Sequence, residues 1–309
     1  MRIVFMGTPD YSVRTLEALI NAGHSVEAVF AQPDKKVGRK QILTPPPVKV
    51  FAAEHNIPVF QPEKLKDNSD VSKALENIKA DIIVVVAYGK ILPENILNMY
   101  KFGCINGHAS LLPKYRGASP IQWAIVNGEK QTGVTIMKMD RGMDTGDIIE
   151  SRKVDIDELD TADTLFEKLS YVSADLTVKV LKDISENKAV FSKQNEALAT
   201  YAPIIKKEMA HLDFNRTAES VRCAVRGYYS WPCAFFFLNN KRIKAISCKV
   251  VKGINAEPGT AIASESGLIV ACKDNEGVLF DSIQPEGSKA MKSADWLRGN
   301  KIKSGEKVG

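Results

Sequence analysis

Short apolar runs rich in β-branched residues alternate with longer amphipathic stretches in the first half of the chain. Runs of this length and composition are typical of buried parallel strands, whose two faces are both covered by protein. The stretches between them space their apolar residues as helices do. This alternation predicts an α/β fold built on a doubly wound, mostly parallel sheet. The expected strands are 2–6, 25–31, 59–60, 81–87, a short strand ending at 105, and 132–139; the expected helices are 11–22 and 48–55.

The pattern changes after a long amphipathic segment that starts near Asp160. Its apolar residues recur at helical spacing up to Leu181, which predicts one helix that covers a face of the sheet and closes the first domain near Asn187. The next residues mix Gln, Asn and Pro and are typical of a linker. Beyond them, a short helix and five short strands with basic turns predict a small OB-like β-barrel. The predicted domains are 1–187 and 206–309, with the linker 188–205 between them; the expected helix is 217–226 and the expected strands are 233–238, 242–251, 260–263, 267–271 and 277–283.

Positive charge is concentrated in the last third of the chain. Residues 205–309 hold 17 Lys and Arg against 11 Asp and Glu, whereas the rest holds 25 basic and 26 acidic residues. A surplus confined to one domain predicts a polyanionic partner such as a nucleic acid, although a merely solubilising surface is an alternative. The loop 32–47 is also basic, with three lysines and Arg39. Loops of that length in compact domains are either functional or disordered.

The sequence lacks the signals of several protein classes. No apolar run approaches the roughly 18 residues that a membrane span needs. The chain begins directly with a predicted strand, so we expect no secretory leader. The five cysteines are scattered without a close pair or metal-ligand spacing, which is typical of reduced thiols in a cytoplasmic protein. Gly7 stands alone after the first strand, so the G-x-G-x-x-G fingerprint of a dinucleotide site is missing.

Polar side chains that suit acyl transfer follow two strands in the middle of the predicted sheet. Asn106 and His108 come directly after the short strand, and Asp144 lies in a turn-rich segment after the strand that follows. Residues two apart in an extended chain point to the same side, so the carboxamide and the imidazole are expected to face one cleft. An amide donor, an acid/base and a carboxylate that orients it form a set that catalyses acyl transfer.

Structural roles are the alternative for each of these residues. Asn106 can cap a turn, His108 can be a core histidine, and the aspartates at 140, 144 and 147 can all be turn formers. No activated Ser or Cys accompanies the three residues in the same motifs. If the set is catalytic, the substrate therefore has to supply the nucleophile.

A series of motifs resembles the folate-dependent formyltransferases over nearly the whole chain. They are Asn106-Gly-His108, Ser110-Leu-Leu-Pro113, Tyr115-Arg-Gly117, Pro120-Ile-Gln122, Thr132-Gly-Val-Thr-Ile-Met137, Met139-Asp140 and Asp144-Thr-Gly-Asp147. Residues 2–10, the loop from Gln32 to Arg39, Trp231-Pro232 and Gln284-Pro285 resemble the branch of that family that formylates a charged tRNA. Gly107 is a departure, since the family usually carries a larger apolar residue there, and glycine weakens a strand end.

This resemblance implies both a fold and a reaction. The fold would be a Rossmann-like formyltransferase domain followed by the OB-like domain. The reaction would move the formyl group of 10-formyltetrahydrofolate to the α-amino group of methionyl-initiator tRNA, for translation initiation and without a metal. The residues implied are Asn106, His108 and Asp144 for catalysis, Ser110, Leu111, Leu112 and Pro113 for folate binding, and Arg39 for contact with the acceptor end of the tRNA.

Two other functions remain open on the sequence. A glycinamide ribonucleotide or nucleotide-sugar formyltransferase would use the same chemistry on another acceptor, but the basic loop and the basic last third argue against it. A non-catalytic tRNA-binding protein on the same scaffold would not need Asn106, His108 and Asp144. We expect a cytoplasmic monomer without membrane association.

Overall fold

The computed structural model describes residues 1–38, 40–303 and 305–309, and these form two compact units. The first unit comprises Met1–Pro120, Thr132–Asp155 and Phe166–Ala202. The second comprises Ile121–Gln131, Ile156–Leu165 and Pro203–Gly309. The units thus follow no single cut in the chain, and the domain boundaries drawn from the sequence at 187 and 206 stay a prediction.

A seven-stranded sheet in the order β10-β9-β7-β6-β1-β2-β5 forms the centre of the first unit. β1 pairs in parallel with β2 and β6, and β2–β5 and β6–β7 are also parallel. Only the β7–β9 pairing is antiparallel among those whose register is defined. The predicted mostly parallel, doubly wound sheet is confirmed. Its strands are β1 (Arg2–Gly7), β2 (Ser25–Phe30), β5 (Val59–Phe60), β6 (Ile82–Val86), β7 (Cys104–His108), β9 (Gln131–Lys138) and β10 (Ile148–Asp155).

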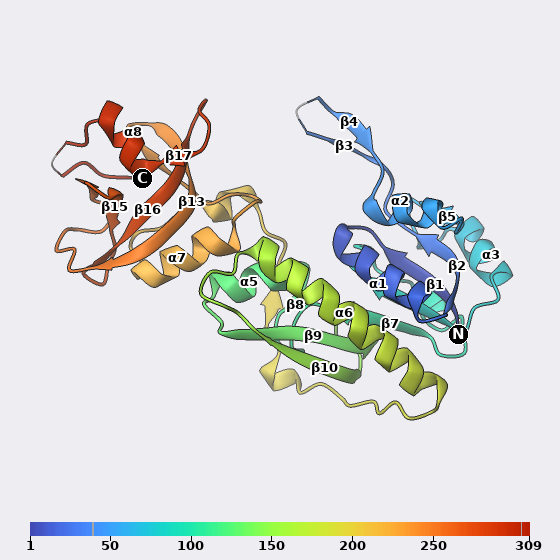
Figure 1. Cartoon of the computed structure of the whole chain (residues 1–309). Coiled ribbons are helices and arrows are strands. Elements are labelled where there is room, and N and C mark those ends of the chain that lie inside the picture. Colours follow the sequence, from blue (N-terminus) through green and yellow to red (C-terminus); the bar gives the residue numbers. More distant parts are fainter. Residues whose placement is uncertain (39, 304) are drawn as a thin grey trace. The chain divides into compact units, whose positions relative to one another are not determined.

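Helices cover both faces of this sheet because its central strands are apolar on both sides. On one face, residues of β1 and β6 form a core with α3 and α4. On the other face lie α1 and α6, in front of the strands in Figure 1, where the Tyr11 hydroxyl of α1 donates to the Leu169 carbonyl of α6 at 3.2 Å. The helices of this unit are α1 (Asp10–Asn21), α2 (Pro47–Glu54), α3 (Ser69–Asn77), α4 (Glu94–Leu97) and α6 (Ala162–Ser185).

Several elements of the first unit, including α4 and β10, were missing from the sequence-based prediction, and two others bear on the argument below. The first is α3, which is capped by Asn68, whose side-chain oxygen accepts hydrogen bonds from Asp70 N and Val71 N. The second is a two-stranded antiparallel hairpin inside the loop 32–47, made of β3 (Lys35–Val37) and β4 (Ile42–Thr44). Arg39, for which we predicted a tRNA contact, lies outside the described residues.

The second unit holds a curled antiparallel sheet in the order β12-β13-β16-β15-β14, with β17 paired to β16. The register of the long β13–β16 pair shifts near Ser247, and irregularities of this kind bend and twist a sheet. The resulting half-barrel confirms the predicted OB-like domain. Its elements are α5 (Pro120–Val126), η2 (Lys207–Ala210), α7 (Ala218–Gly227), β12 (Phe235–Leu238), β13 (Lys241–Lys252), β14 (Ala261–Ser264), β15 (Gly267–Ala271), β16 (Glu276–Pro285), β17 (Met291–Lys292) and α8 (Ser293–Gly299).

Candidate functional site

The carboxyl end of β7 carries Asn106 and His108 on the same side of the strand. Gly107 between them faces α6, where a Cβ on this glycine would lie 2.9 Å from Ser173 Oγ. Since side chains alternate along a strand, Asn106 and His108 project from the opposite face. Asn106 is partly exposed, and within the described part of the chain its carboxamide makes no hydrogen bond. A free amide donor therefore stands beside a buried imidazole.

The His108 ring lies between two hydrogen-bond acceptors. Its Nε2 is 2.9 Å from the Tyr115 carbonyl oxygen, and its Nδ1 is 3.5 Å from Asp144 Oδ2. A carbonyl oxygen only accepts, so Nε2 carries a hydrogen in this arrangement. A ring with hydrogen on both nitrogens satisfies both acceptors. The pair of contacts fixes the plane of the ring, which is buried.

Asp144 reaches His108 from the segment between β9 and β10. Its backbone has a φ of 55°, a left-handed conformation that is uncommon outside glycine. Its Oδ2 also accepts a hydrogen bond of 2.8 Å from the Gly117 amide. Asp140, by contrast, accepts from Gly142 N and Thr145 Oγ1 within its own turn. The structure thus brings Asp144 to His108 and leaves Asp140 as a turn former.

The segment Ser110-Leu-Leu-Pro113, predicted to bind folate, is anchored to β9. Thr135 Oγ1 donates to the Ser110 carbonyl at 2.7 Å and accepts from Leu112 N at 3.1 Å. The Ser110 hydroxyl is buried and donates to the Lys114 carbonyl at 2.6 Å. The segment is therefore a fixed wall next to the strand that carries His108, and Ser110 has its hydroxyl occupied internally. Folate binding by these four residues stays a prediction.

Sequence reasoning assigned no role to Arg116 or Gln194, which also surround Asp144. Arg116 is fully buried, and Gln194 donates to two carbonyls of the Asp144 segment. Arg116 belongs to a motif that carried the family resemblance, and this was the one available signal. Gln194 falls in the segment predicted to be a linker, where nothing in the residue spacing pointed to a site.

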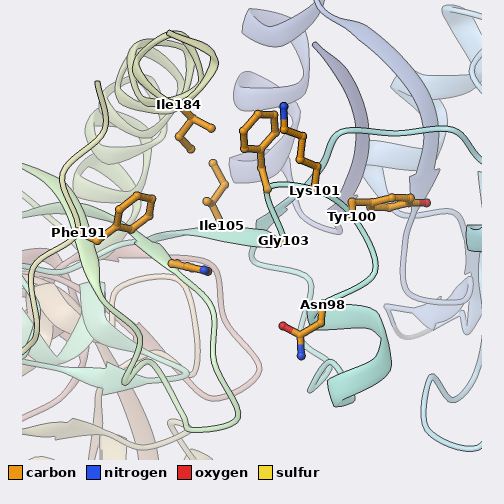
Figure 2. Close-up of a pocket in the computed structure, with 9 residues that line it drawn as sticks. Asn98, Tyr100, Lys101, Gly103, Ile105, Ile184 and Phe191 are labelled. Atoms are coloured by element: carbon orange, nitrogen blue, oxygen red, sulfur yellow. The ribbon is translucent and has the colours of Figure 1, made fainter. Parts of the chain in front are cut away.

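A pocket of about 310 Å³ opens at the other end of β7 and is separate from this site. Ile105 lines it close to the amino end of the strand, together with Gly103, Ile184 and Phe191. Figure 2 shows Ile105, Ile184 and Phe191 grouped together, with Tyr100 pointing away from them. The Tyr100 hydroxyl indeed donates to the Leu75 carbonyl, at 2.6 Å.

Two features are absent from residues 1–38, 40–303 and 305–309. No three His, Cys, Asp or Glu side chains gather there in a way that would hold a metal ion. No helix there has the length and apolar character needed to cross a bilayer.

Comparisons with known proteins agree on one family. The family profile described as Formyl transferase matches residues 1–181, and the one described as Formyl transferase, C-terminal domain, matches residues 204–301. The chain is 46% identical to a methionyl-tRNA formyltransferase of Staphylococcus epidermidis over 299 residues, which cover 96% of each chain. It is 45% identical to that of Bacillus subtilis over 310 residues, which cover 100% of this chain and 98% of the other. An N-formyltransferase from Helicobacter canadensis, solved in complex with folinic acid and dTDP-3-aminofucose, shares the fold with a TM-score of 0.67 and 20% identity, over 90% of this chain and 98% of that one.

Proposed function

This chain belongs to the formyl transferase family, and from that premise we propose that it formylates the α-amino group of methionyl-initiator tRNA. The formyl donor is 10-formyltetrahydrofolate. The product serves translation initiation. The observation that carries the proposal is the His108–Asp144 pair next to the free carboxamide of Asn106, in a chain that is 45% identical to its tRNA-formylating relatives.

The residues at the end of β7 suit transfer of a formyl group to an amine. As the new C–N bond forms, negative charge grows on the formyl oxygen, and the Asn106 carboxamide is free to donate a hydrogen bond to it. The amine must lose a proton, and the leaving nitrogen of the donor must gain one. We assign this transfer to His108, which Asp144 orients through Nδ1; its Nε2 must first leave the Tyr115 carbonyl, 2.9 Å away, to reach the amine. The nucleophile belongs to the substrate, which explains why the site needs no activated Ser or Cys.

The donor fits the residues present around Asn106. Its reactive group is a carbonyl that needs one hydrogen-bond donor, and the Asn106 carboxamide is such a donor without a partner in the described chain. Leu111 and Pro113 are half-buried apolar residues on a segment held by Thr135, in which Leu112 is buried. We assign the folate to this segment.

The acceptor is assigned from charge and from the β3–β4 hairpin. The hairpin carries exposed Lys35 and Lys36, which are close to Arg39 in the sequence, and its register pairs Lys36 with Leu43. We propose that Arg39 contacts the acceptor end of the tRNA and that the basic second unit holds the rest of it. A guanidinium offers a planar fork for phosphates and a face for stacking on bases, which Lys lacks.

One assay separates the candidate acceptors. Purified protein and labelled 10-formyltetrahydrofolate are incubated in parallel with methionyl-initiator tRNA, glycinamide ribonucleotide and a nucleotide-linked amino sugar. We expect label in the tRNA alone. Label in either small acceptor and none in the tRNA would reject the proposal, whereas tRNA binding without transfer to any acceptor would favour a binding protein.

Three further points belong to the same proposal. We propose that the chain acts in the cytoplasm, because a protein that modifies initiator tRNA meets it where translation begins. We propose that it acts as a monomer, because one chain supplies all of Asn106, His108 and Asp144. The functional division into 1–187, the connection 188–205 and 206–309 also remains part of this proposal.

A further inference from the structure

The segment 192–202, which we call the strap, runs across the site on its way to the second unit. Its first residue, Ser192, exchanges two backbone hydrogen bonds of 2.8 Å with Ile148 at the start of β10. Its last residues, Tyr201 and Ala202, form β11 and pair in parallel with β8 (Arg116–Gly117). Backbone hydrogen bonds therefore tie one end of the strap to β10 and the other end to β8.

Gln194 of the strap holds the backbone of Asp144. Its Nε2 donates to the Asp144 carbonyl at 2.8 Å and to the Gly146 carbonyl at 2.7 Å. Its Oε1 accepts from Arg116 Nε at 3.1 Å and Nη2 at 2.7 Å. The carbonyls only accept and the guanidinium only donates, so the orientation of the amide is fixed by its neighbours. These contacts hold the left-handed backbone that aims the Asp144 carboxylate at His108.

Arg116 fixes the orientation of the Gln194 side chain. Its side chain is 0% exposed, and besides Gln194 it donates to both carboxylate oxygens of Glu196, at 2.8 and 2.7 Å. These hydrogen bonds lower the pKa of the Glu196 carboxyl, so it stays charged opposite the guanidinium. A fully buried arginine needs such partners, because an unpaired buried charge is costly.

The other end of the strap holds the second partner of His108. Thr200 Oγ1 accepts from Tyr115 N at 2.9 Å, and the Thr200 carbonyl accepts from Arg116 N at 2.8 Å. Tyr115 has a φ of 59°, and its carbonyl is the acceptor for His108 Nε2. One short segment thus fixes both acceptors between which the imidazole lies.

We propose that Gln194 and Arg116 are positioning residues for formyl transfer, acting on His108 through Asp144 and the Tyr115 carbonyl. This inference rests on the proposed function, because it takes Asp144 as part of the reacting site. The strap is the last part of the first unit before the chain enters Pro203–Gly309 of the second. An error of about 1 Å in such geometry costs roughly 100-fold in rate.

Gln194→Glu is the sharpest test. The glutamate keeps an acceptor for Arg116 but loses both N–H donors, so the carbonyls of Asp144 and Gly146 are released. We expect kcat to fall about 10- to 100-fold, while KM for folate and for tRNA changes less than about 3-fold. The Gly117 amide, which donates to Asp144 Oδ2, should exchange faster with solvent as Asp144 moves. The matched control is Lys193→Ala, whose side chain is 91% exposed on the same strap and which should keep wild-type kcat.

Two more variants keep the test decisive. Gln194→Ala removes the same donors without adding charge and replaces Gln194→Glu if the latter does not fold; its kcat should fall in the same range. Arg116→Lys retains the positive charge but loses the planar guanidinium that donates to Gln194 and Glu196 together, so its kcat should be lower than that of the wild type. Wild-type kcat and unchanged Gly117 exchange in folded Gln194 variants would overturn the inference. If the wild-type protein formylates no tRNA, the proposed function itself fails. If Asp144→Asn is inactive while the Gln194 variants keep full activity, only the inference about the strap fails.

Discussion

At the scale of single residues, removing the charge of Asp144 distinguishes a catalytic role of this residue from a purely structural one. Asp144→Asn keeps an acceptor for the Gly117 amide but presents a neutral side chain to His108 Nδ1. We expect kcat to fall roughly 10²–10⁴-fold, the usual contribution of positioned acid–base groups. The kcat of His108→Ala should fall by the same factor. Asn106→Ala should cost about 3 kcal/mol of transition-state stabilisation.

These three variants are compared with the wild type in single-turnover formyl transfer, with thermal unfolding as the control for folding. Near-wild-type turnover in the His108 or Asp144 variant would remove that residue from the reaction. Equal loss of tRNA binding in all three would point to a structural role instead.

The presence of glycine at position 107 is explained by Ser173, which faces it from α6. A Cβ at this position would lie 2.9 Å from Ser173 Oγ but 3.5 Å from Ile136 and Val86, so the hydroxyl alone is too close. We expect Gly107→Ala to gain nothing by itself. In the Ser173→Ala background, the same change should stabilise the protein by about 0.4–1 kcal/mol, because alanine restricts the unfolded chain. Urea unfolding of the four proteins measures the coupling; an equal gain in both backgrounds would show that Ser173 does not select the glycine.

The sequence was sufficient for those residues of the site that lie in register on a strand. Asn106 and His108 are two apart, and period-two alternation places them together without any tertiary information. Gln194 was out of reach, because it binds carbonyls of residues 144 and 146 through a side chain that any linker can contain. Such side-chain-to-backbone contacts leave no periodic trace in the sequence.

At the scale of elements, the sequence predicted the strands and helices that bury many apolar residues and missed those that bury few. The strand 267–271 was predicted with the bounds that β15 has, since four of its five residues are buried. α3 was missed, because only Val71 and Leu75 are buried in it and two residues do not define a period. The β3–β4 hairpin was missed for the same reason, since all six of its strand residues are exposed.

The β3–β4 hairpin is the element on which selectivity for tRNA is expected to depend. Its Ile42 and Leu43 are 61% and 63% exposed, so the described part of the hairpin buries little apolar surface. We expect Arg39→Ala to lower kcat/KM for tRNA by at least about 10-fold, the loss of one charge-assisted contact. Arg39→Lys should restore only part of it, since Lys is a point charge.

Folate affinity, measured separately, should be unchanged in both Arg39 variants. Lys79→Ala serves as the matched control, because it removes one exposed positive charge of the same unit. Full rescue by Lys, or an equal loss of folate affinity, would mean that Arg39 is not the contact with the acceptor end.

At the scale of the whole molecule, the surplus of positive charge was predictable from the sequence, but the set of residues that form the second unit was not. The surplus of positive charge in residues 205–309 could be counted from the sequence. The composition of the second unit could not, because residues 121–131 and 156–165 belong to it. Trp123 and Val126 pack on its core, and Arg226 donates to the carbonyls of Asp157 and Asp160. Contacts between segments so far apart in the chain leave no local pattern that a linear reading detects.

The basic strand β13 allows a test of tRNA binding in the intact protein. Lys244 stands opposite Phe235, and Arg242 lies over the Phe235 ring at 3.8 Å, whereas Ile243 and Ala245 between and beside them are buried in the core. Cationic side chains therefore line the outer side of this strand. Each phosphate they neutralise releases a counterion, so tRNA binding should weaken steeply as salt rises.

We expect the double variant Arg242→Gln/Lys244→Gln to reduce the slope of log K against log salt by about 1.5, because each phosphate contact contributes roughly 0.7–0.9. The control Lys73→Gln/Lys79→Gln removes the same charge from exposed positions of the first unit and should keep the wild-type slope. Because both variants lower the net charge equally, long-range attraction changes alike in the two, and a difference in slope reports direct contacts alone. Equal slopes in all three proteins would show that β13 does not touch the tRNA backbone, and would leave the positive charge of the second unit as a property of its surface.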